Sequence, residues 1–228
     1  MKTIGRNECI IYNPEINRKM KNRMTAHLFT AILIAALPFC ETLEPREQEI
    51  LRVPQAKAAD YEQYLVDTGQ YTTRGKVFHD RYRDHLIGIA RIATEKYKLA
   101  VQKNSIGFYH DKKAKDPDRL YLGFDFRVEP GPGTEDYGYG NMVGHLLRKH
   151  IQDFLYITQS CGKVFAEKEI VGSVVGINWE RSGRIQHFNF WIEEKEAALF
   201  EGNRITLTEL IERNTITNAE GLILRLKK

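Results

Sequence analysis

The sequence has few cysteines and no long run of apolar residues, and each shortage excludes a class of protein. A membrane span needs roughly 18 apolar residues in a row, so a mean hydropathy of −0.45 with 28% charged residues excludes a bundle of spans. Of the three cysteines, Cys9 and Cys40 lie in a segment that we expect to be removed, which leaves Cys161 alone. No intramolecular disulfide then forms in the mature chain, and we expect Cys161 to be a small buried apolar residue.

Clustered positive charge is also scarce. The net charge is +4, and residues 1–58 carry +3 of it, which leaves +1 on the remaining 170 residues. Nucleic-acid binding depends on clustered Lys and Arg that release phosphate counterions. An almost neutral body with interspersed signs therefore gives no reason to expect nucleic acid as a partner.

Familiar catalytic and cofactor motifs are absent from the sequence. It has no G-x-S-x-G, no P-loop and no C-x-x-C, so we expect no cofactor. His145 and His150 are five residues apart on a predicted helix and do not share a face, so no metal site is expected. The Gly-rich loop 129–140 precedes a helix, but Glu135 and Asp136 within it would repel a phosphate.

An N-terminal segment has the layout of a secretory signal. Three basic residues, Lys19, Lys21 and Arg23, precede the apolar stretch 26–39, and a polar stretch follows. Fourteen residues in a helix reach only about 21 Å, short of the roughly 30 Å hydrocarbon layer of a membrane. We therefore expect an exported protein, periplasmic or secreted.

How this segment is processed is left open between four alternatives. The first is a cleaved signal, for which 56–58 (Ala-Lys-Ala) fits the small-x-small rule. The others are an uncleaved anchor, a lipid anchor at Cys40 and an ordinary core helix. Contact with a membrane is expected only through this segment, if it is uncleaved or lipidated.

The rest of the chain divides into a linker, a helix and a folded domain. Apolar residues recur every three or four positions from Phe78 to Ala100, which predicts one long amphipathic helix. The predicted organisation is a leader and signal peptide or anchor at 1–58, a linker at 59–75, the amphipathic helix at 76–104 and an α+β domain at 119–228.

From residue 120 onward, strand and helix patterns follow one another in a recognisable order. The patterns predict a strand at 120–128, a helix at 141–161, strands at 170–180 and 184–193, a helix at 206–213 and a last strand at 222–226. This βαββαβ order predicts a ferredoxin-like sandwich, in which two helices cover one face of a four-stranded antiparallel sheet.

The two middle strands are predicted to form a hairpin with a two-residue loop. If Arg181 faces Arg184 across Ser182-Gly183, the apolar residues of both strands fall on one face, whereas a three-residue loop mixes polar and apolar residues. The hydrophobic pattern therefore selects the two-residue loop.

In a ferredoxin-like sheet the first and third strands are central neighbours, so their non-core side chains are expected to meet on the uncovered face. These candidate binding residues are Tyr121, Asp125, Arg127, Asn178, His187, Asn189 and Trp191. Aromatic, Arg and hydrogen-bonding side chains on one rigid sheet are typical of an interaction hot spot. The competing expectation is that helix 76–104 covers this face and satisfies those groups.

We therefore expect a non-enzymatic envelope protein that binds a protein partner through the open sheet face or the amphipathic helix. The alternative is a small exported enzyme or ligand-binding domain that uses Asp125, Arg127 and His187, with His187 as a general base oriented by Asp125. No nucleophile in a recognisable setting accompanies them. The plan of leader, apolar segment, amphipathic helix and ferredoxin-like domain resembles that of the alignment subunits of type IV pili and type II secretion, in architecture and in no motif.

Overall fold

The computed structural model describes residues 45–52, 54–110 and 119–226, which fall in one compact unit, Thr42–Lys228. The predicted signal segment at 26–39 and the lipidation candidate Cys40 lie outside these residues. Among the helices that the structure describes, none has both the length and the apolar character needed to cross a membrane.

The end of the predicted leader (1–58), the predicted linker and the predicted long helix together form a set of shorter helices. They are α1 (Pro45–Leu51), α2 (Gln55–Glu62), the 3-10 turn η2 (Thr68–Gln70), α3 (Thr73–Arg81), α4 (Arg83–Arg91) and the π-helical turn η3 (Ile92–Lys96). The prediction of one helix over 76–104 is wrong. The helix breaks at Tyr82, with φ −110° and ψ 21°, and helical structure ends before Lys98, whose φ is +54°.

The apolar spacing hides this break because α3 and α4 turn the same side toward the core. Phe78 on α3 and Leu86 and Ile89 on α4 are all fully buried. A pattern of buried positions reports the side that faces the core, and it continues when two helices share that side. The buried residues of α3 and α4 that gave the amphipathic pattern are thus part of the core and are not free to bind a partner.

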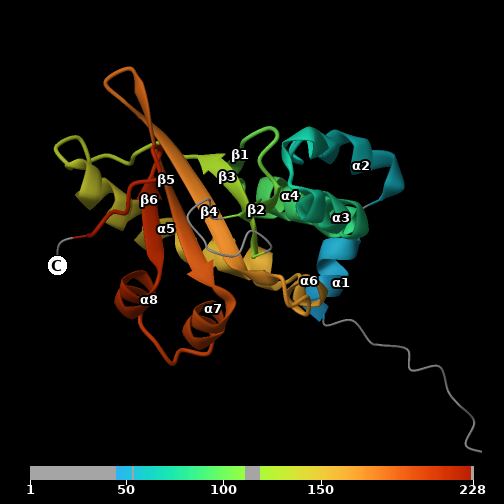
Figure 1. Ribbon diagram of the computed structural model, residues 1–228. Helices are drawn as coiled ribbons and strands as arrows, with labels where there is room; N and C mark the ends of the chain where they lie inside the picture. Colours follow the sequence, from blue (N-terminus) through green and yellow to red (C-terminus); the bar gives the residue numbers. More distant parts are fainter. Residues whose placement is uncertain (1–44, 53, 111–118, 227–228) are drawn as a thin grey trace, which may run out of the picture. The chain divides into compact units, whose positions relative to one another are not determined.

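One mixed sheet forms the centre of the unit (Figure 1). Its strands are β1 (Ala100–Val101), β2 (Gly107–His110), β3 (Leu120–Arg127), β4 (Ile170–Arg181), β5 (Arg184–Glu193) and β6 (Thr215–Asn218). The order is β1-β3-β4-β5-β6, with β2 also paired to β3. Only β3 and β4 are parallel. The predicted α+β class with a mostly antiparallel sheet is therefore confirmed.

The strand order differs from the ferredoxin-like expectation in one respect that matters for the site. β4 lies between β3 and β5, whereas the prediction made the strands at 120–128 and 184–193 direct neighbours. The connection from β3 through α5 (Tyr139–Gln159) returns the chain parallel to β3 and beside it, as a direct crossover does.

The last strand also lies earlier than predicted. β6 occupies Thr215–Asn218, and the predicted strand at 222–226 follows it as an irregular segment. That segment touches β6 through a bridge between Thr217 and Ile223 and through the Leu224 N–H, which donates to the Ile216 carbonyl. The alternating leucines 224 and 226 pack against the core without forming a regular ladder.

The predicted hairpin register is confirmed. Arg181 pairs with Arg184, and Ser182 and Gly183 form the two-residue turn with φ of +51° and +73°. Positive φ at both positions is the geometry of a type I′ turn. The capping box at Thr206 and Glu209, which opens α8 (Leu207–Arg213), is also present.

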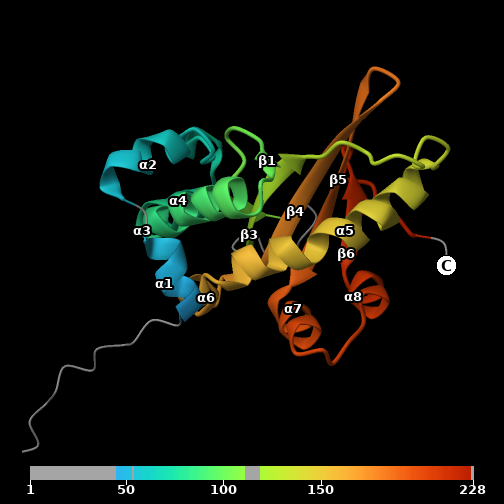
Figure 2. The same cartoon turned by 180° about the vertical axis from the view of Figure 1, so that it is seen from behind.

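Helix α5 covers one face of the sheet, as Figure 2 shows from behind. The core lies between α5 and that face, where Phe124, Ile177 and Phe190 are fully buried. The short helices α6 (Gly162–Phe165) and α7 (Glu194–Glu201) pack against β4. Cys161 is buried and free, as expected.

We call the opposite side of the sheet the polar face. Figure 1 looks onto it, and no helix of the described residues runs across it. The competing expectation, that helix 76–104 covers this face, is therefore not met. Instead α3 packs on β2, where the rings of Phe78 and Phe108 are 5.8 Å apart.

Candidate functional site

Four of the predicted residues meet at the centre of the polar face. In the sheet register Asp125 on β3 lies opposite Gly176 on β4, which lies opposite Asn189 on β5, and Asn178 lies opposite His187. A Cβ added at Gly176 would clash with a carboxylate oxygen of Asp125 and would lie 2.9 Å from His187 Cε1. Because position 176 has no side chain, the Asp125 carboxylate and the His187 ring approach each other above it.

Two amide oxygens hold the His187 ring. Asn178 Oδ1 lies 2.9 Å from Nδ1, and Asn189 Oδ1 lies 3.0 Å from Nε2. An amide oxygen only accepts, so a ring nitrogen of His187 that carries a proton donates to the amide it faces. Asn178 is 6% exposed, and its Nδ2 has no hydrogen-bond partner among the described residues.

The Asp125 carboxyl group carries the clearest electrostatic signature of the cluster. Burial raises its pKa above the usual 3.8, and the charge of His187 opposes that rise. Burial, together with the charge of Asp125, also raises the pKa of Tyr109 well above its usual value. A partly buried carboxyl group whose pKa is shifted by desolvation and by one specific partner is typical of functional sites.

Replacing Asp125 with Asn is expected to flatten the pH dependence of stability. Between the unfolded-state pKa of about 3.8 and the higher folded-state pKa, the folded protein binds more protons than the unfolded one. The free energy of unfolding of the wild type therefore falls as pH rises through this range. The variant lacks this fall, so its stability relative to the wild type increases with pH. Urea unfolding at a series of pH values measures it, and parallel curves would contradict it.

Two aromatic residues of the predicted set lie further along the same strands. The rings of Tyr121 and Trp191 meet edge to face at 5.1 Å. Trp191 Nε1 donates to Thr217 Oγ1 at 3.2 Å, and the Tyr121 hydroxyl donates to Glu193 at 3.0 Å. Tyr121 is 8% exposed, whereas Trp191 is half-buried, so Trp191 is the aromatic ring of this pair with more surface to offer a ligand.

Arg127 does not belong to the central cluster. It is exposed and pairs with Glu180 on β4 at 2.5 Å, and both side chains are about half exposed to solvent (48% and 54%). An exposed pair of this kind contributes at most about 1 kcal/mol. Of the three residues in the enzymatic alternative, the structure brings together Asp125 and His187 only.

A cavity of about 420 Å³ opens beside Trp191 on the polar face. Asn189 and Trp191 on β5, Thr215 and Thr217 on β6, Tyr109 and His110 on β2, and the segment 218–223 line it. Sequence reasoning missed the contributions of β2 and β6. The short run Gly107–His110, with two aromatic residues next to a charged loop, was the signal for β2, but the prediction of a helix to residue 104 obscured it.

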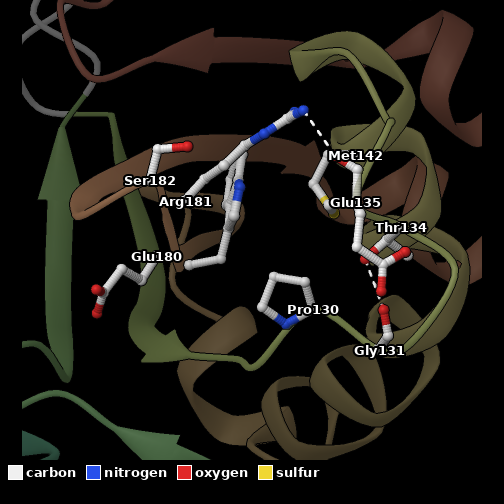
Figure 3. Close-up of a pocket in the computed structure, with 9 residues that line it drawn as sticks. Pro130, Gly131, Thr134, Glu135, Met142, Glu180, Arg181 and Ser182 are labelled. Atoms are coloured by element: carbon white, nitrogen blue, oxygen red, sulfur yellow. Dashed lines mark hydrogen bonds between the residues drawn. The ribbon is translucent and has the colours of Figure 1, made fainter.

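A second cavity, of about 440 Å³, lies beneath the loop 130–135 (Figure 3). Arg181 reaches over it and donates to the backbone carbonyls of Tyr137 and Glu135, while Glu180 points away from it. Because the Arg181 guanidinium is engaged on the loop and Glu135 lies beside the cavity, this cavity is a poor site for an anion.

The described residues contain no group of three or more His, Cys, Asp and Glu side chains arranged to hold a metal ion. His150 packs edge to face on Phe126 at 5.6 Å, and burial lowers its pKa to about 4. His145 contacts Tyr137 in the same way at 5.7 Å. Both histidines thus take part in packing.

The candidate site is therefore the centre of the polar face with the cavity beside it. A scan of protein-family models, a search of curated proteins and a search of solved structures found no match to this chain.

Proposed function

We propose that this protein is a non-enzymatic interaction or assembly protein of the cell envelope that binds a protein partner through the polar face. The observation that carries the proposal is the cavity of about 420 Å³ beside the half-buried Trp191. Interfaces draw most of their affinity from a few Trp, Tyr and Arg anchors in well-packed pockets. Helices α3 and α4 are the weaker choice, because Phe78, Leu86 and Ile89 are buried in the core.

Binding is favoured over catalysis by the contacts of the His187 ring. A general base needs a ring nitrogen without a proton within reach of the substrate, and both nitrogens of His187 face amide oxygens. The enzymatic alternative rests on the raised pKa of Asp125 beside His187. If the protein were such an enzyme, His187→Ala would abolish turnover while Trp191→Ala left it nearly intact.

Export remains part of the proposal, and the packing of α1 bears on the site of cleavage. Ile50 on α1 is fully buried, and Glu47 is 3% exposed. Removal of residues 1–58 would take this helix out of the core, so we place the mature N-terminus before Pro45. Intact-mass analysis of protein from its native envelope fraction tests this, because it distinguishes an early cleavage, an uncleaved chain and a lipid on Cys40.

A photo-crosslinking residue at position 223 is expected to form a discrete protein adduct in native cells, whereas the same residue at position 185 is not. Ile223 borders the cavity and is 63% exposed, and Ile185 near the hairpin turn is 66% exposed, so the two positions differ in place and not in exposure. Adding Trp191→Ala should reduce the adduct by about tenfold or more, as loss of a hot spot does. Equal adducts from both positions would contradict the proposal.

A further inference from the structure

The described residues that line the cavity beside Trp191 carry little charge. Among the described residues that line it, none is Lys or Arg, and His110 and Glu220 are those that can be charged near neutral pH. Among these described lining residues, a phosphate or carboxylate would find no Lys or Arg, and an ammonium group would find Glu220. Burying an unpaired charge is costly, so the cavity favours an uncharged occupant.

The two asparagine side chains that line the cavity, Asn189 and Asn218, are oriented in the same way. Asn189 Oδ1 faces the Nε2 atom of His187, and Asn218 Oδ1 accepts from the Leu222 N–H at 2.8 Å. The oxygens of both amides are therefore already engaged within the protein. Neither Nδ2 has a hydrogen-bond partner among the described residues. The two asparagines thus offer the cavity N–H donors, and an occupant gains by presenting acceptors to them.

We infer that this cavity binds an uncharged, bulky residue of a protein partner, and that this residue carries a ring. The ring lies against Trp191, and backbone carbonyls of the partner accept from the side-chain NH₂ groups of Asn189 and Asn218. The inference rests on the proposed function and names the chemistry of the partner. A peptide fits because each residue carries a carbonyl acceptor next to its side chain. His187 is a positioning residue, since its ring holds the Asn189 oxygen and so directs Nδ2 outward.

The test uses the full-length protein and N-acetyl-L-tyrosinamide. This uncharged probe is a single tyrosine residue with a carbonyl group on each side. In a ¹H–¹⁵N NMR titration, the side-chain NH₂ signals of Asn189 and Asn218 are expected to shift. p-Cresol has the same ring without a carbonyl group. Tyramine has the same ring with an ammonium group in place of the two carbonyl groups. We expect each to bind about tenfold more weakly.

Two isosteric variants test the donors directly. Asn189→Asp and Asn218→Asp keep an oxygen for His187 and for the Leu222 N–H, so the local contacts survive, but each replaces an NH₂ donor with an acceptor. We expect each to weaken N-acetyl-L-tyrosinamide binding by about tenfold or more. Gln186→Glu adds the same charge on β5 outside the cavity lining and should leave binding unchanged.

Several results would overturn the inference. Equal binding of p-cresol and N-acetyl-L-tyrosinamide would show that the carbonyl groups are not recognised, and tighter binding of methyl glucoside would indicate a sugar site. No binding of any probe would exclude the cavity as the anchor site. If position 223 still crosslinks to a partner in that case, the proposed function stands and only this inference fails. Probe binding without a crosslink would support the chemistry of the cavity but contradict the proposed function, and with it the protein partner of this inference.

Discussion

Replacing His85 with Ala is expected to lower the free energy of unfolding by about 3–5 kcal/mol. His85 Nε2 on α4 lies 2.9 Å from Glu47 Oε1 on α1, and the two residues are 9% and 3% exposed. Removing one partner of a buried pair leaves the other group without compensation, which is the costly case. Urea unfolding at neutral pH measures the loss, and we expect it to appear first as detachment of α1.

A second pair, between α1 and the turn η3 that follows α4, serves as the control. Lys96 pairs with Glu49 of α1 at 2.9 Å, but the two side chains are 44% and 38% exposed. An exposed pair gains little because water and salt screen it, so Lys96→Ala should cost less than about 1 kcal/mol. If both variants lost the same amount, burial would not be what makes the His85–Glu47 pair important.

The parts of the fold that the sequence predicted well are those in which local patterns decide. The β4–β5 hairpin is the clearest case, because Ser182-Gly183 sets the turn and a one-residue slip would move every apolar side chain to the wrong face. α5 and the capping box of α8 are similar, since their signals lie within a few residues of each other.

Strand order could not be predicted in the same way. The pattern βαββαβ is compatible with β4 between β3 and β5, as observed, and with β4 outside a β3–β5 pair, and residue spacing does not distinguish these topologies. The break at Tyr82 was hidden for a related reason, because periodicity reports the buried side of a helix and not its continuity.

The central cluster was nevertheless anticipated for a partly wrong reason. The prediction placed Asp125 and His187 on adjacent strands, whereas β4 separates them, and strands are about 4.8 Å apart. The two side chains still meet because Gly176 stands between them and leaves the space above β4 empty. The alternation of residues predicted the shared face, and Gly176 provides the room in which this pair meets.

Gly123→Ala is expected to destabilise the protein by about 3 kcal/mol. In an ordinary strand position this change is favourable by a few tenths to 1 kcal/mol, because glycine loses more backbone entropy on folding. At position 123, however, a Cβ would clash with the backbone carbonyl oxygen of Val174, directly opposite on β4. A backbone atom in a central strand cannot turn aside as a side chain does, so β3 and β4 must separate locally, at the cost of overpacking.

Gly131→Ala is the matched control, because nothing lies within 4 Å of the added Cβ, and its stability should stay within about 0.5 kcal/mol of the wild type. Urea unfolding compares the two variants, and amide hydrogen exchange along β3 and β4 locates the change. Loss of protection at Asp125 and Gly176 in Gly123→Ala would tie the parallel β3–β4 pair to the geometry of the candidate site. A variant as stable as Gly131→Ala would mean that the two strands are held further apart than the register of β3 and β4 implies.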